Sequence, residues 1–322
     1  MGDPAVAAVP ASAAAPASNA APVSAAAPVS AAARGDRPSW RDLAELVRAP
    51  AALSVPGDTI AGAAAAGGMR RSTPALMASS VCLYWGGMAA NDWADRELDA
   101  RERPERPIPS GRVKPRQALL TAAGLTAAGV GLAALAGGRR ALAVAAPLAA
   151  AVWAYDVWAK NTPAGPAVMA ACRGLDVLLG ASGGDVRRAV PSALTVAAHT
   201  YTVTALSRRE VSGATAALPS ATLAGTLGLA VAAAAAPTPG RRFSAAPGAL
   251  AVWYLAGYGG AQIRAAADPS AGRIRAAVGA GITDLPQLQG ALTARAGSPA
   301  YGLALALVAP LARRLARKVS PT

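Results

Sequence analysis

The chain has 322 residues, of which 53% are hydrophobic and 15% are charged. With a mean hydropathy of +0.33, this composition is not that of a typical soluble enzyme. The formal net charge is +14, but the basic residues occur as short arginine pairs between apolar runs, which argues against a nucleic-acid partner. Aromatic residues make up only 4%, so the apolar mass is small and aliphatic and suits closely packed helices. We expect an all-α integral membrane protein in a lipid bilayer.

The first segment is rich in alanine, proline and serine. Its prolines interrupt helix and it has too little apolar bulk to form a core, so we predict a disordered tail over residues 1–37. A short amphipathic stretch up to Arg48 follows, which we expect to lie at the membrane surface. Residues 38–322 are predicted to form one transmembrane domain.

A bilayer core of about 30 Å requires roughly 20 helical residues per crossing. At that length the sequence predicts about nine transmembrane helices. Pro56 and Asp58 interrupt the first of them, which suggests a cavity nearby, because irregular backbone within a membrane must face protein or water. The predicted spans are 50–68, 74–92, 117–136, 141–158, 164–182, 190–207, 217–236, 246–265 and 298–316.

The distribution of basic residues predicts the orientation. With nine crossings and a cytoplasmic N-terminus, more arginine and lysine residues fall on the inner side than on the outer side. We therefore expect a bacterial plasma-membrane protein whose N-terminus and active-site loops are cytoplasmic. The segment Gly279 to Ala296 is expected to be an amphipathic inner loop whose leucines cover a cavity.

An acidic cluster directly follows the second apolar helix. Asn91, Asp92, Asp95 and Asp99 are spaced so that their side chains lie within an arc of about 100° on one helix face. Carboxylate and amide oxygens together suit Mg²⁺, which commonly bridges to substrate phosphates. The alternative is a solvated helix end whose acids pair with nearby arginines. The spacing, the asparagine and the position at the membrane boundary favour the metal site.

The next stretch, Arg103 to Gly111, contains three prolines within six positions and cannot be helical. We therefore predict an extended loop, which brings its guanidinium groups close to the helix face that carries the acidic cluster. Arginine is well suited to binding diphosphate oxygens, because its planar fork donates two parallel hydrogen bonds.

These residues carry a family resemblance. The pattern Asn91-Asp92-x-x-Asp95-x-x-x-Asp99, followed by Arg106-Pro107-Ile108-Pro109-Ser110-Gly111, resembles the first aspartate-rich motif of the UbiA superfamily of intramembrane prenyltransferases. Tyr155-x-x-x-x-Lys160 and Arg173-x-x-Asp176 are similar to further elements of that family, although the first is one residue longer than usual.

The resemblance implies a bundle of nine transmembrane helices around a central cavity and transfer of a prenyl group from a polyprenyl diphosphate to an acceptor. It implies Asn91, Asp92, Asp95 and Asp99 as Mg²⁺ ligands, with Asp92, Asp95 and Lys160 as the catalytic residues. Arg106, Lys160 and Arg173 are the implied diphosphate contacts. The acceptor, the chain length of the donor and the oligomeric state are not specified.

The sequence departs from the family pattern after the sixth predicted helix, where a second aspartate-rich motif is expected. Glu210 is the one acid there and so the one candidate ligand for a second metal, and Arg208 stands where a carboxylate is expected. One interpretation is that Arg208 and Arg209 replace the charge of that metal at the diphosphate. The alternatives are that both arginines are ordinary inner-side flanks of the helix, or that the diphosphate reaction is not performed. The Arg208 and Cys172–Asp176 patterns resemble the EboC-like subgroup of the superfamily.

Two functions remain open. The first is Mg²⁺-dependent prenyl transfer, which the complete first motif favours. The alternative is a non-catalytic UbiA-like protein that binds or exports an isoprenoid or a small-molecule precursor, which the reduced second motif favours. The single histidine, His199, lies on an apolar helix and is expected to make helix–helix hydrogen bonds rather than to act as a base.

Overall fold

The computed structural model describes residues 37–49, 55–235, 244–307 and 310. Within these ranges the chain is helical and has no strand, so the all-α prediction is confirmed. The predicted tail, apart from its last residue, and much of the last predicted span lie outside the described residues. Residues 299–307, at the start of that span, are helical.

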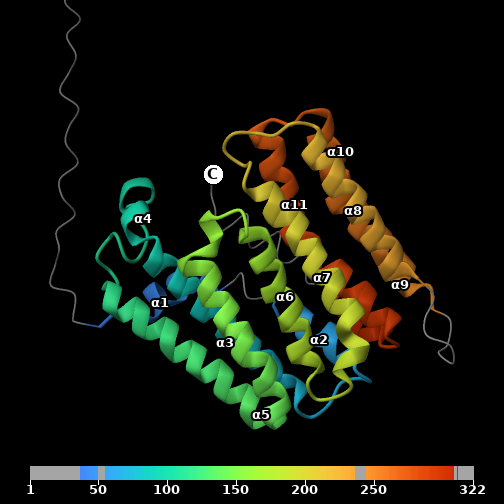
Figure 1. Ribbon diagram of the computed structural model, residues 1–322, viewed down its shortest axis with the longest axis horizontal. Coiled ribbons are helices and arrows are strands. Elements are labelled where there is room, and N and C mark those ends of the chain that lie inside the picture. The colour runs from blue at the N-terminus through green and yellow to red at the C-terminus, as the bar shows by residue number, and fades with distance from the viewer. Residues whose placement is uncertain (1–36, 50–54, 236–243, 308–309, 311–322) are drawn as a thin grey trace, which may run out of the picture. The chain divides into compact units, whose positions relative to one another are not determined.

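The helices follow one another through short connections (Figure 1). The described helices outnumber the nine predicted spans, because some are short surface helices and others are pieces of one longer helix. The number of membrane crossings stays a prediction. They are α1 (Trp40–Leu46), α2 (Pro56–Ala65), α3 (Thr73–Ala94), α4 (Arg96–Glu102), α5 (Pro115–Val157), the 3₁₀ turn η2 (Ala159–Asn161), α6 (Gly165–Ala181), α7 (Val186–Ser207), α8 (Ala217–Ala234), α9 (Ala246–Tyr254), the π-helical η3 (Leu255–Gly259), α10 (Gly260–Ala267) and α11 (Ala271–Arg295).

Helix α5 is two helices joined at Gly138. This glycine has φ 60° and ψ −147°, a conformation that residues with a Cβ rarely adopt, and the chain folds back there. Trp153 Nε1 donates to Thr126 Oγ1 at 3.0 Å, which ties the two arms together. The two predicted spans 117–136 and 141–158 therefore correspond to the two arms of α5.

Small residues face the interior and large apolar residues face outward. The buried residues of α5 are mostly alanine, whereas Leu120 and Leu135 of the same helix are 61% and 87% exposed. In water such exposed leucines would be costly, but lipid is as apolar as they are. By length and composition, α5 and α8 among the described helices are able to span a membrane.

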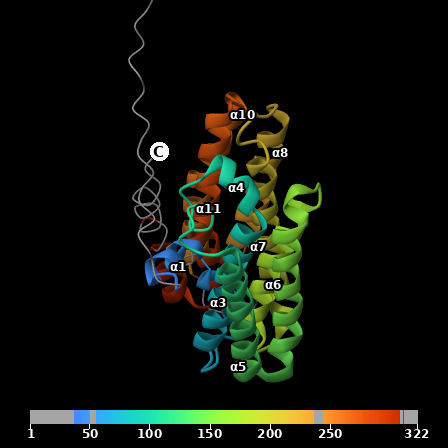
Figure 2. The ribbon, with the colours of Figure 1, turned by 90° about the vertical axis from the view of Figure 1, so that its left-hand side faces the viewer.

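Helices α2 and α6 approach each other closely. A Cβ at Gly180 would overlap the backbone of Thr59, and a Cβ at Gly62 would overlap the carbonyl of Val177. Helix α6 also packs along α7, as Figure 2 shows. Because α2 is only about 15 Å long and starts at Pro56, it does not cross a bilayer by itself. The close crossing brings Asp58, in its first turn, against α6.

The expected loop over Gly279 to Ala296 is wrong. These residues form the second half of α11, which packs against α9, α7 and α2. Its polar side chains Asp284, Gln287 and Gln289 are buried, so a hydropathy scan does not recognise the helix. Gln289 Nε2 donates to Asp58 Oδ1 at 2.6 Å, which shows how a polar face can be accommodated inside the bundle.

Candidate active site

The acidic motif lies where α3 ends and α4 begins. Asp95 stands between the two helices with φ −89° and ψ 3°, so the single continuous helix expected from the sequence is interrupted there. Helix-type hydrogen bonds nevertheless run through the junction, from Asp95 N to Asn91 O at 2.9 Å and from Asp99 N to Asp95 O at 2.8 Å. The side chains of Asp92 and Asp99 are buried, and that of Asp95 is partly exposed.

Each carboxylate of the motif faces a cation from another segment. Asp95 Oδ1 lies 2.7 Å from Lys160 Nζ, in the turn after α5. Asp99 Oδ2 lies 2.7 Å from Arg106 Nη1, and the same nitrogen is 3.5 Å from Asp92 Oδ1. The structure thus brings Arg106 and Lys160, both singled out from the sequence, to the acidic motif.

Arg48 is a third cation at the motif, and sequence reasoning assigned it only to a membrane flank. Its Nη2 lies 2.7 Å from Asp92 Oδ1. Arg48 is the one residue other than glycine with positive φ in the described part of the chain, at 48°. Such a conformation costs free energy unless the surroundings hold it, and it often occurs at functional sites. Nothing in the sequence signals this backbone conformation.

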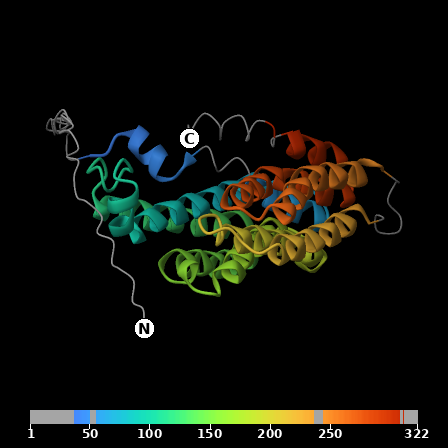
Figure 3. The same cartoon turned by 90° about the horizontal axis from the view of Figure 1, so that it is seen from above.

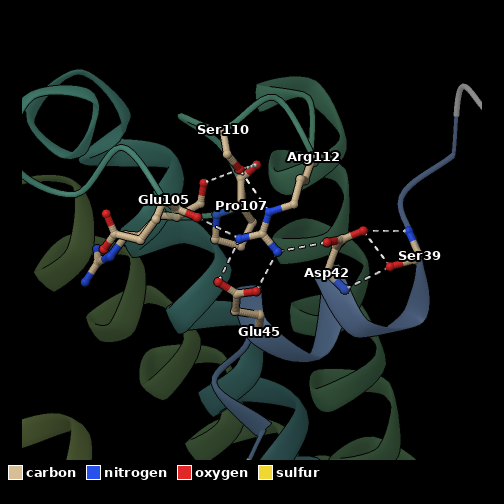
Figure 4. Close-up of polar contacts among 8 residues, drawn as sticks. Ser39, Asp42, Glu45, Glu105, Pro107, Ser110 and Arg112 are labelled. Carbon is tan, nitrogen blue, oxygen red and sulfur yellow. Dashed lines mark hydrogen bonds and ion pairs between the residues drawn. The ribbon is translucent and has the colours of Figure 1, made fainter. Parts of the chain in front are cut away.

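Helix α1, which directly precedes Arg48, is held by contacts with the segment that follows α4. Figure 3 shows α1 close to the segment that follows α4, and Figure 4 shows the contacts that join them. Arg112 donates to both carboxylate oxygens of Glu45, at 2.6 and 2.8 Å, and to Asp42 Oδ1 at 2.9 Å. Its Nη2 also donates to the carbonyl of Glu105 at 2.7 Å. We call these residues the Arg112 clamp: Asp42, Glu45, Glu105 and Arg112.

The clamp has a clear electrostatic signature. The side-chain hydrogen bond from Ser39 is the largest influence on Asp42 and, with Arg112, holds the pKa of Asp42 below its ordinary value against the opposing effect of burial. The carboxylates of Glu45 and Asp42 raise the pKa of Arg112. The clamp therefore fixes α1 to the loop that also carries Arg106, and so positions two of the three cations at the motif.

A cavity adjoins the motif and lies between α3, α5 and α6. The space free of protein atoms in and in front of it, open solvent at its mouth included, amounts to about 540 Å³. Asp156 lines it and accepts a hydrogen bond from Asn91 Nδ2 at 3.1 Å, which links the cavity to the motif. Tyr155 also lines it. Most of the remaining wall is apolar and is formed by Val55, Leu83, Tyr84, Gly87, Met88, Leu148, Val152, Met169 and Cys172.

Arg173, expected at the diphosphate, lines the other end of this cavity. Its Nε lies 2.9 Å from Asp58 Oδ2 on α2. Asp176 accepts from Ser80 Oγ at 2.7 Å. We call this end of the cavity the inner end. It is lined by Ser80, Arg173 and Asp176, and the fully buried Asp58 pairs with Arg173 beside it.

Arg208 and Glu210 follow α7. Arg208 Nη1 donates to the carbonyls of Lys160 and Thr162, at 3.3 and 2.8 Å, so its guanidinium supports the turn that presents Lys160. The carbonyl of Glu210 accepts from Arg275 Nη1 at 3.2 Å. Burial raises the pKa of the Glu210 carboxyl, and Arg275 partly opposes this. A role for Glu210 as a metal ligand stays a prediction.

The motif suits Mg²⁺ by the type of its donor atoms, which are carboxylate and amide oxygens. In the described ranges, no three histidine, cysteine, aspartate or glutamate side chains converge closely enough to hold a metal ion. The carboxylates of the motif do not converge because each is paired with a cation, and Arg48, Arg106 and Lys160 separate them. Metal binding therefore requires carboxylates to leave their cationic partners.

His199 is buried among α7, α9 and α11. Its Nδ1 is 2.8 Å from the Tyr254 hydroxyl, and its Nε2 is 3.2 Å from the Gly281 carbonyl. The prediction of a helix–helix hydrogen-bonding residue is confirmed.

Comparison with known proteins gives concordant results. The digeranylgeranylglyceryl phosphate synthase of Methanothrix thermoacetophila is 42% identical over 86 residues, which is 26% of this chain and 32% of that protein. The synthase of the same name from Natronomonas pharaonis is 38% identical over 157 residues, which is 47% of this chain and 56% of that protein. The chain thus matches about a third to somewhat over half of the length of these curated relatives.

A solved structure described as a digeranylgeranylglyceryl phosphate synthase in membranes has the same fold, with a TM-score of 0.61 at 18% identity. The match covers 80% of this chain and 98% of that one. The model of the UbiA prenyltransferase family matches residues 57–266, a range that contains the acidic motif, the proline-rich loop, Lys160 and every cavity-lining residue except Val55. The chain therefore belongs to the UbiA prenyltransferase family.

Proposed function

We propose that the chain transfers a prenyl group from a polyprenyl diphosphate to an acceptor within the membrane, with Mg²⁺ as its cofactor. Family membership supports this activity. The observation that carries it is the pairing of three carboxylates with three cations beside an apolar cavity, namely Asp92, Asp95 and Asp99 with Arg48, Arg106 and Lys160.

The arrangement is suited to an exchange of partners. Without substrate, each charge at the motif is neutralised by an opposite charge on the chain, which lowers the cost of holding buried carboxylates. In the proposed complex, Asn91, Asp92, Asp95 and Asp99 hold Mg²⁺. The freed cations Arg48, Arg106 and Lys160 bind the diphosphate oxygens.

The chemistry follows from this exchange. The C1–O bond of the donor breaks and both electrons leave with the diphosphate, whose growing negative charge Arg48, Arg106 and Lys160 neutralise. Mg²⁺, when bound, supplies further positive charge to the same leaving group. The apolar wall holds the prenyl tail and excludes water that would otherwise capture the allylic cation. The acceptor atom then bonds to C1, and its proton passes to Asp156, which lines the same cavity.

Residues further away have supporting roles in this proposal. Arg208 acts on the diphosphate through the turn that presents Lys160. Arg173 lies at the inner end, beyond the apolar wall, so we propose that it contacts the acceptor rather than the diphosphate. The subgroup assignment stays a prediction, since the curated relatives above are described as digeranylgeranylglyceryl phosphate synthases.

The family is integral to membranes, and this chain is a membrane protein. The relatives that match are archaeal and give no support to a bacterial source. From the distribution of basic residues, we propose that the acidic motif faces the cytoplasm. Because those relatives are named for digeranylgeranyl products, geranylgeranyl diphosphate is the donor to test first.

The experiment measures diphosphate release by the full chain in lipid nanodiscs, with geranyl, farnesyl or geranylgeranyl diphosphate and a lipid extract as the source of acceptor. Release that needs Mg²⁺ and is lost in Lys160→Ala supports the enzyme. The alternative is a carrier, which the reduced second motif around Glu210 favours. Donor binding at equal affinity in Lys160→Met and wild type, with no release by either, would support the carrier instead.

A further inference from the structure

The end of the bundle away from the acidic motif carries exposed arginines that the proposed function does not use. They lie in or directly after three turns, which connect α2 to α3, the two arms of α5 at Gly138, and α6 to α7. Figures 1 and 2 show these turns at the lower end of the bundle. We call the six exposed side chains the distal arginines: Arg70, Arg71, Arg139, Arg140, Arg187 and Arg188.

The fold holds the three turns against one another. The backbone N–H of Asp185 donates to the carbonyl of Ala66 at 3.1 Å, which joins the turn after α6 to the turn after α2. A Cβ at Gly137, just before the hinge of α5, would lie 3.4 Å from Ser182 Oγ at the end of α6. The distal arginines, which come from three separate segments, therefore form one surface patch.

The acids of the chain do little to neutralise this patch. Among the described residues, Asp185 is the one acid that pairs with a distal arginine, at 3.2 Å from Arg188, and both side chains are more than half exposed. At the other end of the bundle, arginines form close ion pairs with acids, as Arg112 does with Glu45. Six guanidinium groups beside one carboxylate make a strongly positive surface, which attracts an anion.

The length of α3 gives the level of the patch in the membrane. This helix begins at Thr73, two positions after Arg71, and ends at Ala94, directly before Asp95 of the acidic motif. Its 22 residues rise about 33 Å, which is close to the roughly 30 Å of a bilayer's hydrocarbon core. With the acidic motif at one boundary of the membrane, the distal arginines therefore lie near the phosphate groups of the opposite leaflet.

Exposed aliphatic side chains accompany the distal arginines. On the second arm of α5, Leu142 follows Arg139 by three positions and is 38% exposed. On α7, Val190 follows Arg187 by three positions and is 40% exposed. Residues three positions apart on a helix are neighbours on one face. Each of these helices therefore presents hydrocarbon beside a guanidinium group, which complements an amphiphile with an anionic head and a hydrocarbon tail.

We propose that the distal arginines bind the headgroup of an anionic phospholipid, whose hydrocarbon chains lie along Leu142 and Val190. The planar guanidinium fork donates two parallel hydrogen bonds to phosphate oxygens. A zwitterionic headgroup carries its own cation, which the arginines repel, so an anionic headgroup binds more tightly. Free phosphate lacks the hydrocarbon that the aliphatic side chains contact. The site is independent of the proposed prenyl transfer, because it lies at the other boundary of the membrane.

The test measures phospholipid binding to the full chain in dodecyl maltoside micelles by native mass spectrometry. Dioleoylphosphatidylglycerol and dioleoylphosphatidylcholine share their acyl chains and differ in headgroup charge. The wild type is expected to bind the anionic lipid about tenfold more tightly than the zwitterionic lipid, since each arginine near a headgroup adds to the attraction. Inorganic phosphate at the concentration of the lipid should leave the bound lipid in place.

Substitution of exposed arginines locates the site. A triple variant of the patch should reduce the preference for the anionic lipid to about twofold or less. This variant combines Arg139→Gln, Arg140→Gln and Arg187→Gln. A matched control removes the same charge from exposed positions near the other end of the bundle and should keep the tenfold preference. It combines Arg101→Gln, Arg116→Gln and Arg264→Gln.

Thermal unfolding of both triple variants, without added lipid, identifies any loss of fold. If the patch variant does not fold, Arg187→Gln alone takes its place and should lower the preference about twofold. Equal affinity of the wild type for the two lipids contradicts the proposal. The same loss of preference in both triple variants also contradicts it, because net charge would then explain the binding. Displacement of the anionic lipid by inorganic phosphate at the same concentration would identify a free anion as the occupant and likewise overturn the proposal.

Discussion

Arg48 Nη2 lies 2.7 Å from Asp92 Oδ1, although the two residues are 44 positions apart in the chain. Arg48 makes this contact from a left-handed backbone, with φ 48°, just after the end of α1, a helix that Arg112 contacts through Glu45. A residue in a strained backbone conformation that brings a cation to a buried carboxylate of the acidic motif is well placed to bind the leaving diphosphate.

The first prediction concerns this cation. Arg48→Ala should weaken binding of geranylgeranyl diphosphate about tenfold to hundredfold, because a charge-assisted hydrogen bond is worth about 1.5–3 kcal/mol. Equilibrium binding with a labelled donor measures the loss. Arg41→Ala, on α1 but packed over Trp40, is the control and should bind normally. Normal donor binding by Arg48→Ala would remove Arg48 from the diphosphate site.

The second prediction concerns pH and the Arg112 clamp. The pKa of Asp42 is held below its ordinary value of 3.8, mainly by the Ser39 hydrogen bond. A carboxyl with a lowered pKa contributes stability that is present above the unfolded pKa and is lost as pH falls through the folded pKa. Attachment of α1 should therefore persist at pH 7 and weaken below about pH 4.

Hydrogen exchange of the α1 amides, corrected for intrinsic rates, reports that attachment. In the wild type, protection should fall several-fold between pH 5 and pH 3, as the ion pairs with Arg112 are lost. In Arg112→Gln, protection should already be low at pH 7. If α1 is equally protected in both proteins, the clamp does not hold it.

The third prediction separates two adjacent arginines. Arg208 holds the carbonyls of Lys160 and Thr162, so Arg208→Ala should misplace Lys160 and slow prenyl transfer about tenfold or more. Arg209→Ala, its exposed neighbour, should have little effect. Initial rates of diphosphate release at saturating donor make the comparison. Equal rates in both variants would mean that Arg208 supports neither Lys160 nor the diphosphate.

The fourth prediction concerns the crossing of α2 and α6. A Cβ at Gly180 would overlap the backbone of Thr59, so Gly180→Ala should force the helices apart and destabilise the fold by about 1–3 kcal/mol. At Gly124 a Cβ would meet open space, and Gly124→Ala should be neutral or stabilising by about 0.5–1 kcal/mol. Thermal unfolding in detergent compares the two. A Gly180→Ala protein as stable as Gly124→Ala would show that the crossing is not tight.

The local features of this site could be predicted from the sequence, because they depend on the spacing of residues along a helix and on the positions of prolines. The acidic motif and the extended loop carrying Arg106 are of this kind. The contact between Arg48 and Asp92 could not be predicted from the sequence, since it depends on a backbone conformation and on the Arg112 clamp, which two distant segments of the chain form. Helix α11 was missed for a different reason. Its glutamines and Asp284 lower hydropathy, but they are buried inside the helical bundle, where Gln289 donates to Asp58.

The inner end of the cavity shows the same limit. The family resemblance implies Arg173 as a diphosphate contact, and that role stays a prediction. The ion pair of Arg173 with Asp58, across the close crossing of α2 and α6, could not be predicted. The pairing was decided by backbone packing at Gly180, which no pattern along α6 alone reveals.

The central claim is that the motif binds a Mg²⁺–diphosphate unit by exchanging ion-pair partners. The most direct measurement is equilibrium binding of a non-ionising thiolo analogue of geranylgeranyl diphosphate, with and without Mg²⁺, to the wild type and to Asp92→Asn. Because binding linkage is reciprocal, Mg²⁺ should raise the affinity for the analogue at least tenfold in the wild type, and the effect should disappear in Asp92→Asn. An affinity that is the same with and without Mg²⁺ in the wild type would contradict the account.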